Sequence, residues 1–177
     1  MEHFPVMLEE TVDALAVKRG GRYVDGTLGR AGHTKEIIAR GGLVLGIDRD
    51  DEALARVGEM AIEGLTAVKG DHGDIARLAA ENGWEEVDGI LLDLGVSSPQ
   101  LDEAGRGFSF LRDGPLDMRM DRTGGVTAAE IVNSASAERL ERIFREQGEE
   151  PRARKGWKRS SARGARSRGP DRSRRRS

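Results

Sequence analysis

Residues 22–34 read RYVDGTLGRAGHT, and this stretch decides the fold. A short apolar strand ends on Asp25, and Gly26, Gly29 and Gly32 follow before a helix begins near His33. Glycine allows positive φ and close approach of the backbone, and the first turn of a helix offers free N–H donors. Taken alone, this pattern indicates a tight strand-to-helix turn, with or without a ligand.

Outward from this turn, apolar strands alternate with helices along the chain. The expected strands span residues 43–47, 65–68 and 87–92, and the expected helices span 7–17, 51–61 and 75–81. The strands are continuously apolar, which is typical of strands buried on both faces. The pattern predicts an α/β fold with a parallel, doubly wound sheet, whose ligand site lies beyond the carboxyl ends of the strands.

Acidic residues stand at those carboxyl ends. Asp25, Asp48 and Asp93 each close an expected strand. The turn fits neither the dinucleotide fingerprint nor the P-loop, and carboxylates repel phosphate. The three carboxylates suit S-adenosyl-L-methionine, which carries a sulfonium, an ammonium and a ribose. Asp48 follows Gly29 by about 20 residues, the spacing of an acid that binds ribose hydroxyls. The alternative is that Asp48 caps the helix beginning near Asp51.

The segment DLGVSSPQ, from Asp93 to Gln100, follows the last expected strand. A carboxylate and a carboxamide there can accept hydrogen bonds from an amino group. An exocyclic amine is a poor nucleophile because its lone pair is delocalised into the ring. An acceptor for its N–H therefore assists attack on a methyl group, and alignment supplies much of the remaining acceleration. Asp93 is the candidate catalytic residue.

Five runs together resemble the bacterial 16S ribosomal RNA (cytosine N4)-methyltransferases: DGTLGRAGHT, GIDRD, DGILLDLGVSSPQLD, RGFSF and GPLDMRMD. The resemblance covers residues 3–155 and is most specific between residues 88 and 121. It implies a class I (Rossmann-like) methyltransferase, with a helical insertion after the fourth strand. The implied cofactor is S-adenosyl-L-methionine, and the implied substrate is a cytidine in the decoding region of small-subunit ribosomal RNA.

The resemblance also implies the residues of the site. Those that hold the cofactor are Ala31, Gly32, His33, Asp48, His72, Asp93 and Gln100. Asp48 binds the ribose, and Asp93 and Gln100 lie in the cofactor and target pocket. His72 replaces an adenine-contacting aromatic that is commonly Phe, and Ala31 stands where some members have Gly. Without the resemblance, His33 is simply a first-turn helix residue. Three arginines, Arg106, Arg112 and Arg119, either contact RNA phosphates or are solvated.

Charge divides the chain. Residues 1–150 carry 17 Lys and Arg against 30 Asp and Glu, whereas residues 151–177 carry 12 against one. We expect a cofactor-binding part at residues 1–100, a substrate loop with the start of a helical insertion at 101–150, and a basic tail at 151–177. Residues 156–177 are largely Arg, Gly, Ala, Ser and Pro and are expected to be disordered.

The resemblance stops near Lys155, where family members continue for considerably longer. Because the tail has the composition of GC-rich DNA read in the wrong frame, we expect a frameshifted or truncated product with weak or no activity. The rival interpretation is a basic tail that binds phosphates without sequence preference. Without later strands, the fourth strand exposes Ile90, Leu91 and Leu92 at an open edge, which predicts poor solubility or a partner-dependent fold.

The leading functional prediction is methylation of the N4 amino group of a cytidine, with small-subunit ribosomal RNA as the partner. Two alternatives remain: a class I methyltransferase acting on another amino group, and a non-enzymatic, basic-tailed RNA-binding fragment. The sequence has no cysteine, which excludes disulfides and Cys-ligated zinc. No stretch approaches the length of a membrane span, so we expect a cytoplasmic protein without membrane contact.

Overall fold

A computed structural model describes residues 5–153, with Ser98 and Pro99 described by their backbone alone. The chain separates into two compact units, Met1–Ser97 and Ser98–Ser177. The expected disordered tail at 156–177 lies outside the described residues. Within residues 5–153, no helix has both the length and the apolar character needed to cross a bilayer.

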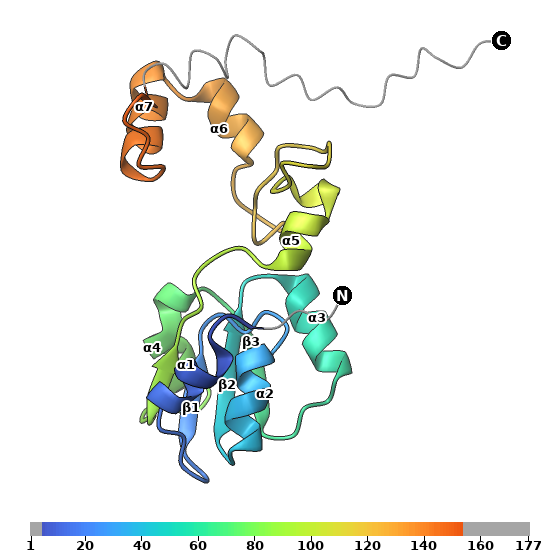
Figure 1. The fold of residues 1–177 in the computed structure, drawn as a ribbon, viewed down its shortest axis with the longest axis vertical. Coiled ribbons are helices and arrows are strands. Elements are labelled where there is room, and N and C mark those ends of the chain that lie inside the picture. Colours follow the sequence, from blue (N-terminus) through green and yellow to red (C-terminus); the bar gives the residue numbers. More distant parts are fainter. Residues whose placement is uncertain (1–4, 154–177) are drawn as a thin grey trace, which may run out of the picture. The chain divides into compact units, whose positions relative to one another are not determined.

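The first unit is built on four parallel strands in the order β3-β2-β1-β4 (Figure 1). The strands are β1 Arg22–Asp25, β2 Leu43–Asp48, β3 Leu65–Lys69 and β4 Gly89–Leu91. β1 lies between β2 and β4, and Asp25 stands opposite both Gly46 and Leu91. The predicted parallel α/β sheet is confirmed, although β4 is shorter than the expected segment 87–92.

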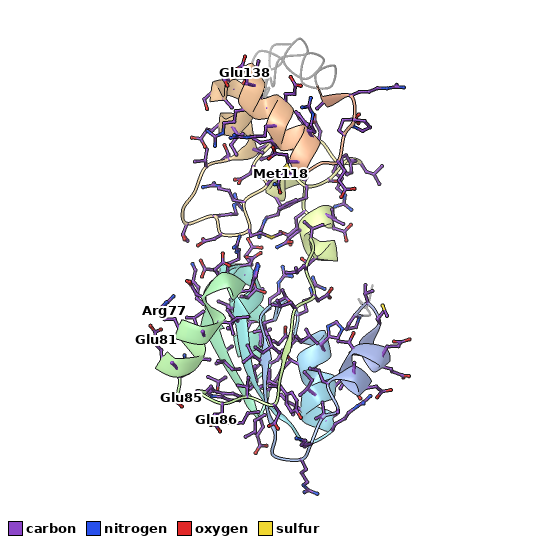
Figure 2. All side chains as sticks on the ribbon, turned by 90° about the vertical axis from the view of Figure 1, so that its left-hand side faces the viewer. Arg77, Glu81, Glu85, Glu86, Met118 and Glu138 are labelled. Atoms are coloured by element: carbon purple, nitrogen blue, oxygen red, sulfur yellow. The ribbon has the colours of Figure 1, made fainter. Side chains whose placement is uncertain are left out.

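The helices of this unit cover both faces of the sheet. They are α1 Leu8–Ala14, α2 Gly32–Ala39, α3 Asp51–Glu59 and α4 Ile75–Glu81, with a 3-10 turn, η1, at His72–Asp74. The outer face of α4 is charged: Arg77 donates hydrogen bonds to Glu81 at 2.9 Å and to Asp74 at 2.9 Å (Figure 2). Its inner face is apolar, so α4 is amphipathic and can cover the sheet.

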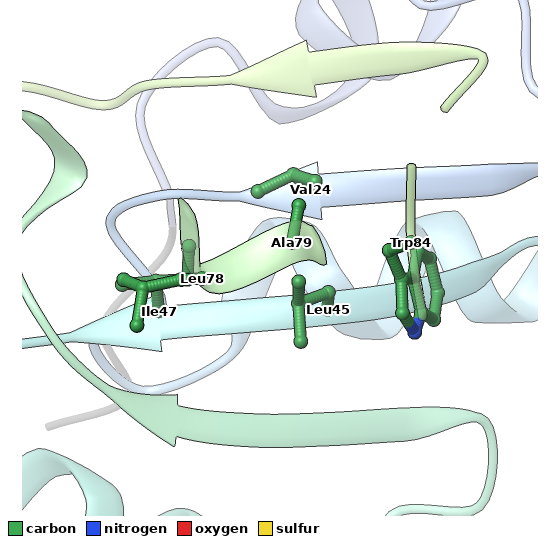
Figure 3. Packing of buried hydrophobic residues seen from close by; sticks show 6 residues of the cluster. All are labelled: Val24, Leu45, Ile47, Leu78, Ala79 and Trp84. Atoms are coloured by element: carbon green, nitrogen blue, oxygen red, sulfur yellow. The ribbon is translucent and has the colours of Figure 1, made fainter. Parts of the chain in front are cut away.

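Two buried clusters hold the helices against the sheet. On one face, Val12 of α1 and Ile37 of α2 pack with strand residues Tyr23 and Val44. On the other, the cluster consists of Val24, Leu45, Ile47, Leu78, Ala79 and Trp84 (Figure 3). Because successive strand residues point to opposite faces, Val44 and Leu45 serve different clusters. The doubly wound arrangement predicted from continuous apolar strands is therefore confirmed.

Among the described residues, β4 pairs with β1 alone and forms an edge of the sheet. Ile90 is 50% exposed and Leu92 is 45% exposed, as predicted. The prediction is wrong for Leu91, which is buried. Leu91 points to the same face as Gly89, where Leu15 and Tyr23 lie close by.

The second unit contains three α-helices among its described residues. They are α5 Ser98–Asp102, α6 Ala128–Ser134 and α7 Ala137–Glu146, and η2, a 3-10 turn, spans Ala104–Arg106. The segment 101–150, where a substrate loop and the start of a helical insertion were expected, thus contains η2 and two separate helices, α6 and α7. They separate because Ala135 is extended, with ψ 146°, and Ser136 caps α7 by accepting the Arg139 N–H.

Two arginines hold the irregular segment of this unit from within. Arg106 is buried, and its guanidinium donates to the Met120 carbonyl at 3.0 Å. Arg119 forms a bidentate pair with Asp117 at 2.7 and 2.9 Å, which lowers the pKa of the Asp117 carboxyl to about 2. Arg106 is therefore neither solvated nor placed to contact RNA, and Arg119 is an internal ion-pair partner. Arg112 is exposed and donates to a backbone carbonyl at 2.7 Å.

Candidate functional site

The turn between β1 and α2 is fixed to both neighbouring strands. The Leu28 N–H donates to the Ile47 carbonyl at 3.0 Å, and the Gly26 N–H donates to the Leu91 carbonyl at 2.9 Å. Between these bonds and α2, the backbone enters the left-handed region at Gly29, with φ 50°. The turn is thus a fixed backbone loop at the carboxyl ends of β2, β1 and β4, where the sequence predicted a ligand site.

Ala31 and Gly32 form the junction of this turn with α2. Ala31 is buried and takes φ 59°, a conformation that costs an L-residue more than it costs glycine. At Gly32, a Cβ would come within 2.3 Å of Pro5 Cγ, so a larger residue would displace the N-terminal segment. Both predicted cofactor residues therefore shape the backbone at the start of the helix.

Asp48, the last residue of β2, is bonded directly to the turn. Its Oδ2 accepts the Gly29 N–H at 2.7 Å, and its Oδ1 accepts the Asp50 N–H at 2.9 Å. The cap of α3 is Asp50, whose side chain accepts the Glu52 N–H at 3.1 Å. The alternative that Asp48 caps this helix is therefore wrong. Since a carboxylate oxygen can accept more than one bond, Asp48 retains capacity for a hydroxyl donor.

Asp93 and His33 lie side by side. Asp93 follows β4 by two residues, its side chain is 50% exposed, and its Oδ2 is 3.9 Å from His33 Nδ1. His33 is buried, and its Nε2 lies 3.1 Å from the Val6 carbonyl oxygen. A carbonyl only accepts, so this bond requires the proton on Nε2. The structure thus places the candidate catalytic carboxylate beside the first turn of α2.

His72 lies next to the glycine turn. A Cβ built on Gly26 would be 3.4 Å from His72 Cβ. The imidazole is exposed, and its Nδ1 is 3.6 Å from Asp71 Oδ1. Asp71 also accepts the Gly73 N–H at 2.8 Å and forms an ion pair with Arg49. His72 is therefore held on a short ordered turn after β3, with its ring accessible.

Of the predicted site residues, Gln100 alone belongs to the second unit. It lies in α5, and its side chain is buried. Gln100 is thus a residue of the second unit, whereas the group at the strand ends belongs to the first. The residues that the first unit brings together are Ala31, Gly32, His33, Asp48, His72 and Asp93.

Asp25, the last residue of β1, supports the turn from the interior of the first unit. Its carboxylate is buried, Oδ2 accepts the Thr34 hydroxyl at 2.7 Å, and Oδ1 accepts the Thr27 N–H at 3.1 Å. Burial raises the pKa of the Asp25 carboxyl, while the bonds from Thr34 and Thr27 act in the opposite direction. The sequence placed Asp25 among the carboxylates that suit S-adenosyl-L-methionine, but in the structure its two oxygens accept hydrogen bonds from Thr27 and Thr34.

Thr27 and Thr34 are the residues that sequence reasoning missed. Both hydroxyls lie within hydrogen-bonding distance of Asp25, and Thr27 also accepts the Asp93 N–H at 2.7 Å. Two threonines flanking a glycine turn that follows a buried acid were the available signal. Their partners were not predictable, because Asp93 follows a strand distant in sequence and Asp25 is buried in the sheet.

The arrangement presents carboxylates around a fixed turn. Asp48 lies on one side of the end of β1 and Asp93 on the other, since β2 and β4 flank β1. Such a group favours cationic or hydroxyl-bearing ligands and disfavours phosphates.

A family model described as the MraW methylase family matches residues 1–166. The chain belongs to the MraW methylase family. The resemblance drawn from the five sequence runs is thereby confirmed, and membership of this methylase family implies a methyl donor. The carboxylate-lined turn is accordingly a candidate methyl-donor site.

Three curated relatives of this MraW methylase family chain are 48% identical to it, and each is named ribosomal RNA small subunit methyltransferase H. The relative from Nitrosococcus oceani matches over 154 residues, which is 84% of this chain and 49% of the relative. That from Shewanella amazonensis matches over 157 residues, 86% of this chain and 50% of the relative. That from Deinococcus radiodurans matches over 153 residues, 86% of this chain and 49% of the relative. The chain spans about half the length of the curated relatives it matches.

A solved structure, the C-terminal domain of precorrin-6Y C5,15-methyltransferase from Rhodobacter capsulatus, aligns with a TM-score of 0.42 at 21% identity. The alignment covers 54% of this chain and 52% of that chain. The fold of the MraW methylase family chain follows from its own strand order, β3-β2-β1-β4.

Proposed function

We propose that the first unit binds S-adenosyl-L-methionine, and that the chain contributes to methylation of the N4 amino group of a cytidine in small-subunit ribosomal RNA. The observation that carries this proposal is the bond from the Gly29 N–H to Asp48, which joins the turn after β1 to the end of β2. The family and the names of the curated relatives support the reaction class and the RNA substrate.

The residues present suit this cofactor by their chemistry. Asp48 offers carboxylate lone pairs to ribose hydroxyls, and Asp93 offers a half-exposed negative charge to a cationic group. His72 presents an accessible imidazole face beside Gly26, where an adenine can stack. When bound, S-adenosyl-L-methionine would supply a methyl group activated by its sulfonium.

Asp93 is the proposed catalytic residue. Its carboxylate accepts a hydrogen bond from the amino group of the target base. This bond keeps the nitrogen lone pair directed away from the carboxylate. As the nitrogen forms its new bond, the carboxylate is the acceptor for the proton that it loses.

The test is calorimetric titration of the full chain with S-adenosyl-L-methionine, comparing the wild type with Asp48→Ala. Asp88→Ala is the matched control: Asp88 accepts the Arg22 N–H at 2.9 Å, as Asp48 accepts an amide, but at the opposite end of the strands. We expect saturable binding by the wild type and by Asp88→Ala, and a loss of at least about tenfold in Asp48→Ala. Absence of binding by a folded wild-type chain, or equal loss in both variants, would overturn the proposal.

A further inference from the structure

The hydroxyl of Thr27 lies between Asp25, the last residue of β1, and Asp93, which follows β4. Its Oγ1 accepts the Asp93 N–H at 2.7 Å and lies 3.4 Å from Asp25 Oδ1. A hydroxyl has one donor and two acceptor positions, so both contacts can be made together. Sixty-six residues of sequence separate Thr27 from Asp93.

This contact continues the pairing of β1 with β4 after the strands themselves have ended. The last register pair is Asp25 with Leu91, and the Gly26 N–H then donates to the Leu91 carbonyl at 2.9 Å. The next bond between the two segments is made by the Thr27 side chain and the Asp93 amide. The backbone at Asp93 is thereby secured beyond the end of β4.

The orientation of the Thr27 hydroxyl is fixed from the interior. Asp25 is buried and receives the Thr27 N–H at 3.1 Å, and its second oxygen receives the Thr34 hydroxyl at 2.7 Å. With a carboxylate acceptor on one side, the hydroxyl proton points towards Asp25 and a lone pair faces the Asp93 amide.

We propose that Thr27 is a positioning residue, which holds the Asp93 backbone so that the Asp93 carboxylate faces the start of α2 at His33. The chemical role of Asp93 rests on the proposed function, whereas the bond between Thr27 and the Asp93 amide does not depend on it. Thr27→Val keeps the side-chain shape and removes the hydroxyl, and Thr27→Ser keeps the hydroxyl and removes a methyl group.

The first readout is hydrogen exchange of the Asp93 amide in the full chain, which requires neither cofactor nor activity. We expect exchange about tenfold faster in Thr27→Val and within about twofold of the wild type in Thr27→Ser. The Leu28 amide is the internal control, because it donates to the Ile47 carbonyl across the same turn without the hydroxyl. An unchanged Asp93 amide in Thr27→Val, or equal acceleration of both amides, would overturn the proposal.

The second readout is methyl transfer to small-subunit RNA. We expect Thr27→Val to lower kcat about tenfold with little change in the KM for the methyl donor, and Thr27→Ser to restore it. Equal losses in the two variants, or a change in KM alone, would contradict a positioning role. If the wild type transfers no methyl group, that result counts against the proposed function, and the Asp93 amide still decides the role of Thr27.

Discussion

Asp48 accepts the backbone N–H of Gly29 at 2.7 Å, and this bond ties the end of β2 to the turn that follows β1. The residue predicted to bind a ribose is therefore also a structural partner of the loop it serves. A substitution at Asp48 changes both functions, so substitutions elsewhere in the turn are needed to separate them.

Gly29→Ala separates backbone strain from carboxylate chemistry. Gly29 has φ 50°, and an added Cβ would meet only the Thr27 carbonyl oxygen, at 3.7 Å. We expect a loss of about 1–2 kcal/mol in the free energy of unfolding, together with weaker S-adenosyl-L-methionine binding. Gly83→Ala is the matched control, since Gly83 has φ 73° and open space around it. Urea unfolding and calorimetry should show equal destabilisation but weaker binding in Gly29→Ala alone.

Thr34→Val removes the hydroxyl that satisfies buried Asp25. We expect a loss of about 1–3 kcal/mol in the free energy of unfolding, because a buried acceptor loses its donor. Thr34→Ser keeps the donor and should cost less. Trp84 is buried in the first unit, so urea unfolding followed by its fluorescence, in a Trp157→Phe background, reports on this unit. Equal losses in Thr34→Val and Thr34→Ser would mean that the methyl group, and not the bond, matters.

Asp25 makes the first unit less stable as the pH rises. Burial raises the pKa of this carboxyl above 3.8 in the folded state. Its contribution is fully present below the unfolded pKa and is lost as the pH rises through the folded pKa. We expect the free energy of unfolding of the wild type, relative to that of Asp25→Asn, to fall above about pH 4. Urea unfolding followed by Trp84 fluorescence measures both. A constant difference between the two proteins across this range would contradict the raised pKa.

The contribution of Asp117 to stability has the opposite pH dependence. Its pKa is lowered from 3.8 to about 2 by the Arg119 guanidinium, so its contribution is present above the unfolded pKa and is lost as the pH falls towards 2. The Ala128 N–H donates to the Asp117 carbonyl at 2.8 Å and reports on this region. We expect the protection of this amide, relative to Asp117→Asn, to decline between about pH 4 and pH 2. A decline that is already complete at pH 4 would show that the ion pair does not lower the pKa.

Ile90→Lys should reduce self-association. Ile90 lies half-exposed in β4, whose outer edge has no partner strand among the described residues, and lysine on an edge strand opposes pairing with another chain. We expect a higher soluble fraction and less concentration-dependent light scattering than for the wild type. Thr66→Lys, at an exposed position of edge strand β3, is the control and should change scattering less.

The sequence predicted those features that depend on local pattern. Continuous apolar strands predicted the parallel sheet, which is confirmed. The spacing of Gly29 and Asp48 predicted an acid that binds a ribose, whereas the bond that the structure adds joins Asp48 to Gly29 itself. It did not predict contacts that depend on the packed interior. Arg106 was expected at the surface and is buried against the Met120 carbonyl, because the loop folds around it. Leu91 was expected to be exposed and is buried, because alternation along the strand points its side chain to the opposite face from Ile90 and Leu92.

The site residues divide in the same way. Acids at strand ends could be predicted because parallel strands finish at one edge of a sheet. The bond from the Asp93 amide to Thr27 could not be predicted, because it depends on β1 and β4 being neighbours in the sheet. Asp48 and Asp50 were also close in sequence, and only the structure distinguishes the turn partner from the cap of α3.

The turn after β1 is bonded to β2 through Leu28 and to β4 through Gly26. A loop restrained from two sides has already lost most of its conformational entropy during folding, so little remains to be lost when a ligand arrives. Association at this loop therefore resembles docking to a preorganised receptor. Its rate should depend on diffusion and charge more than on any rearrangement of the loop.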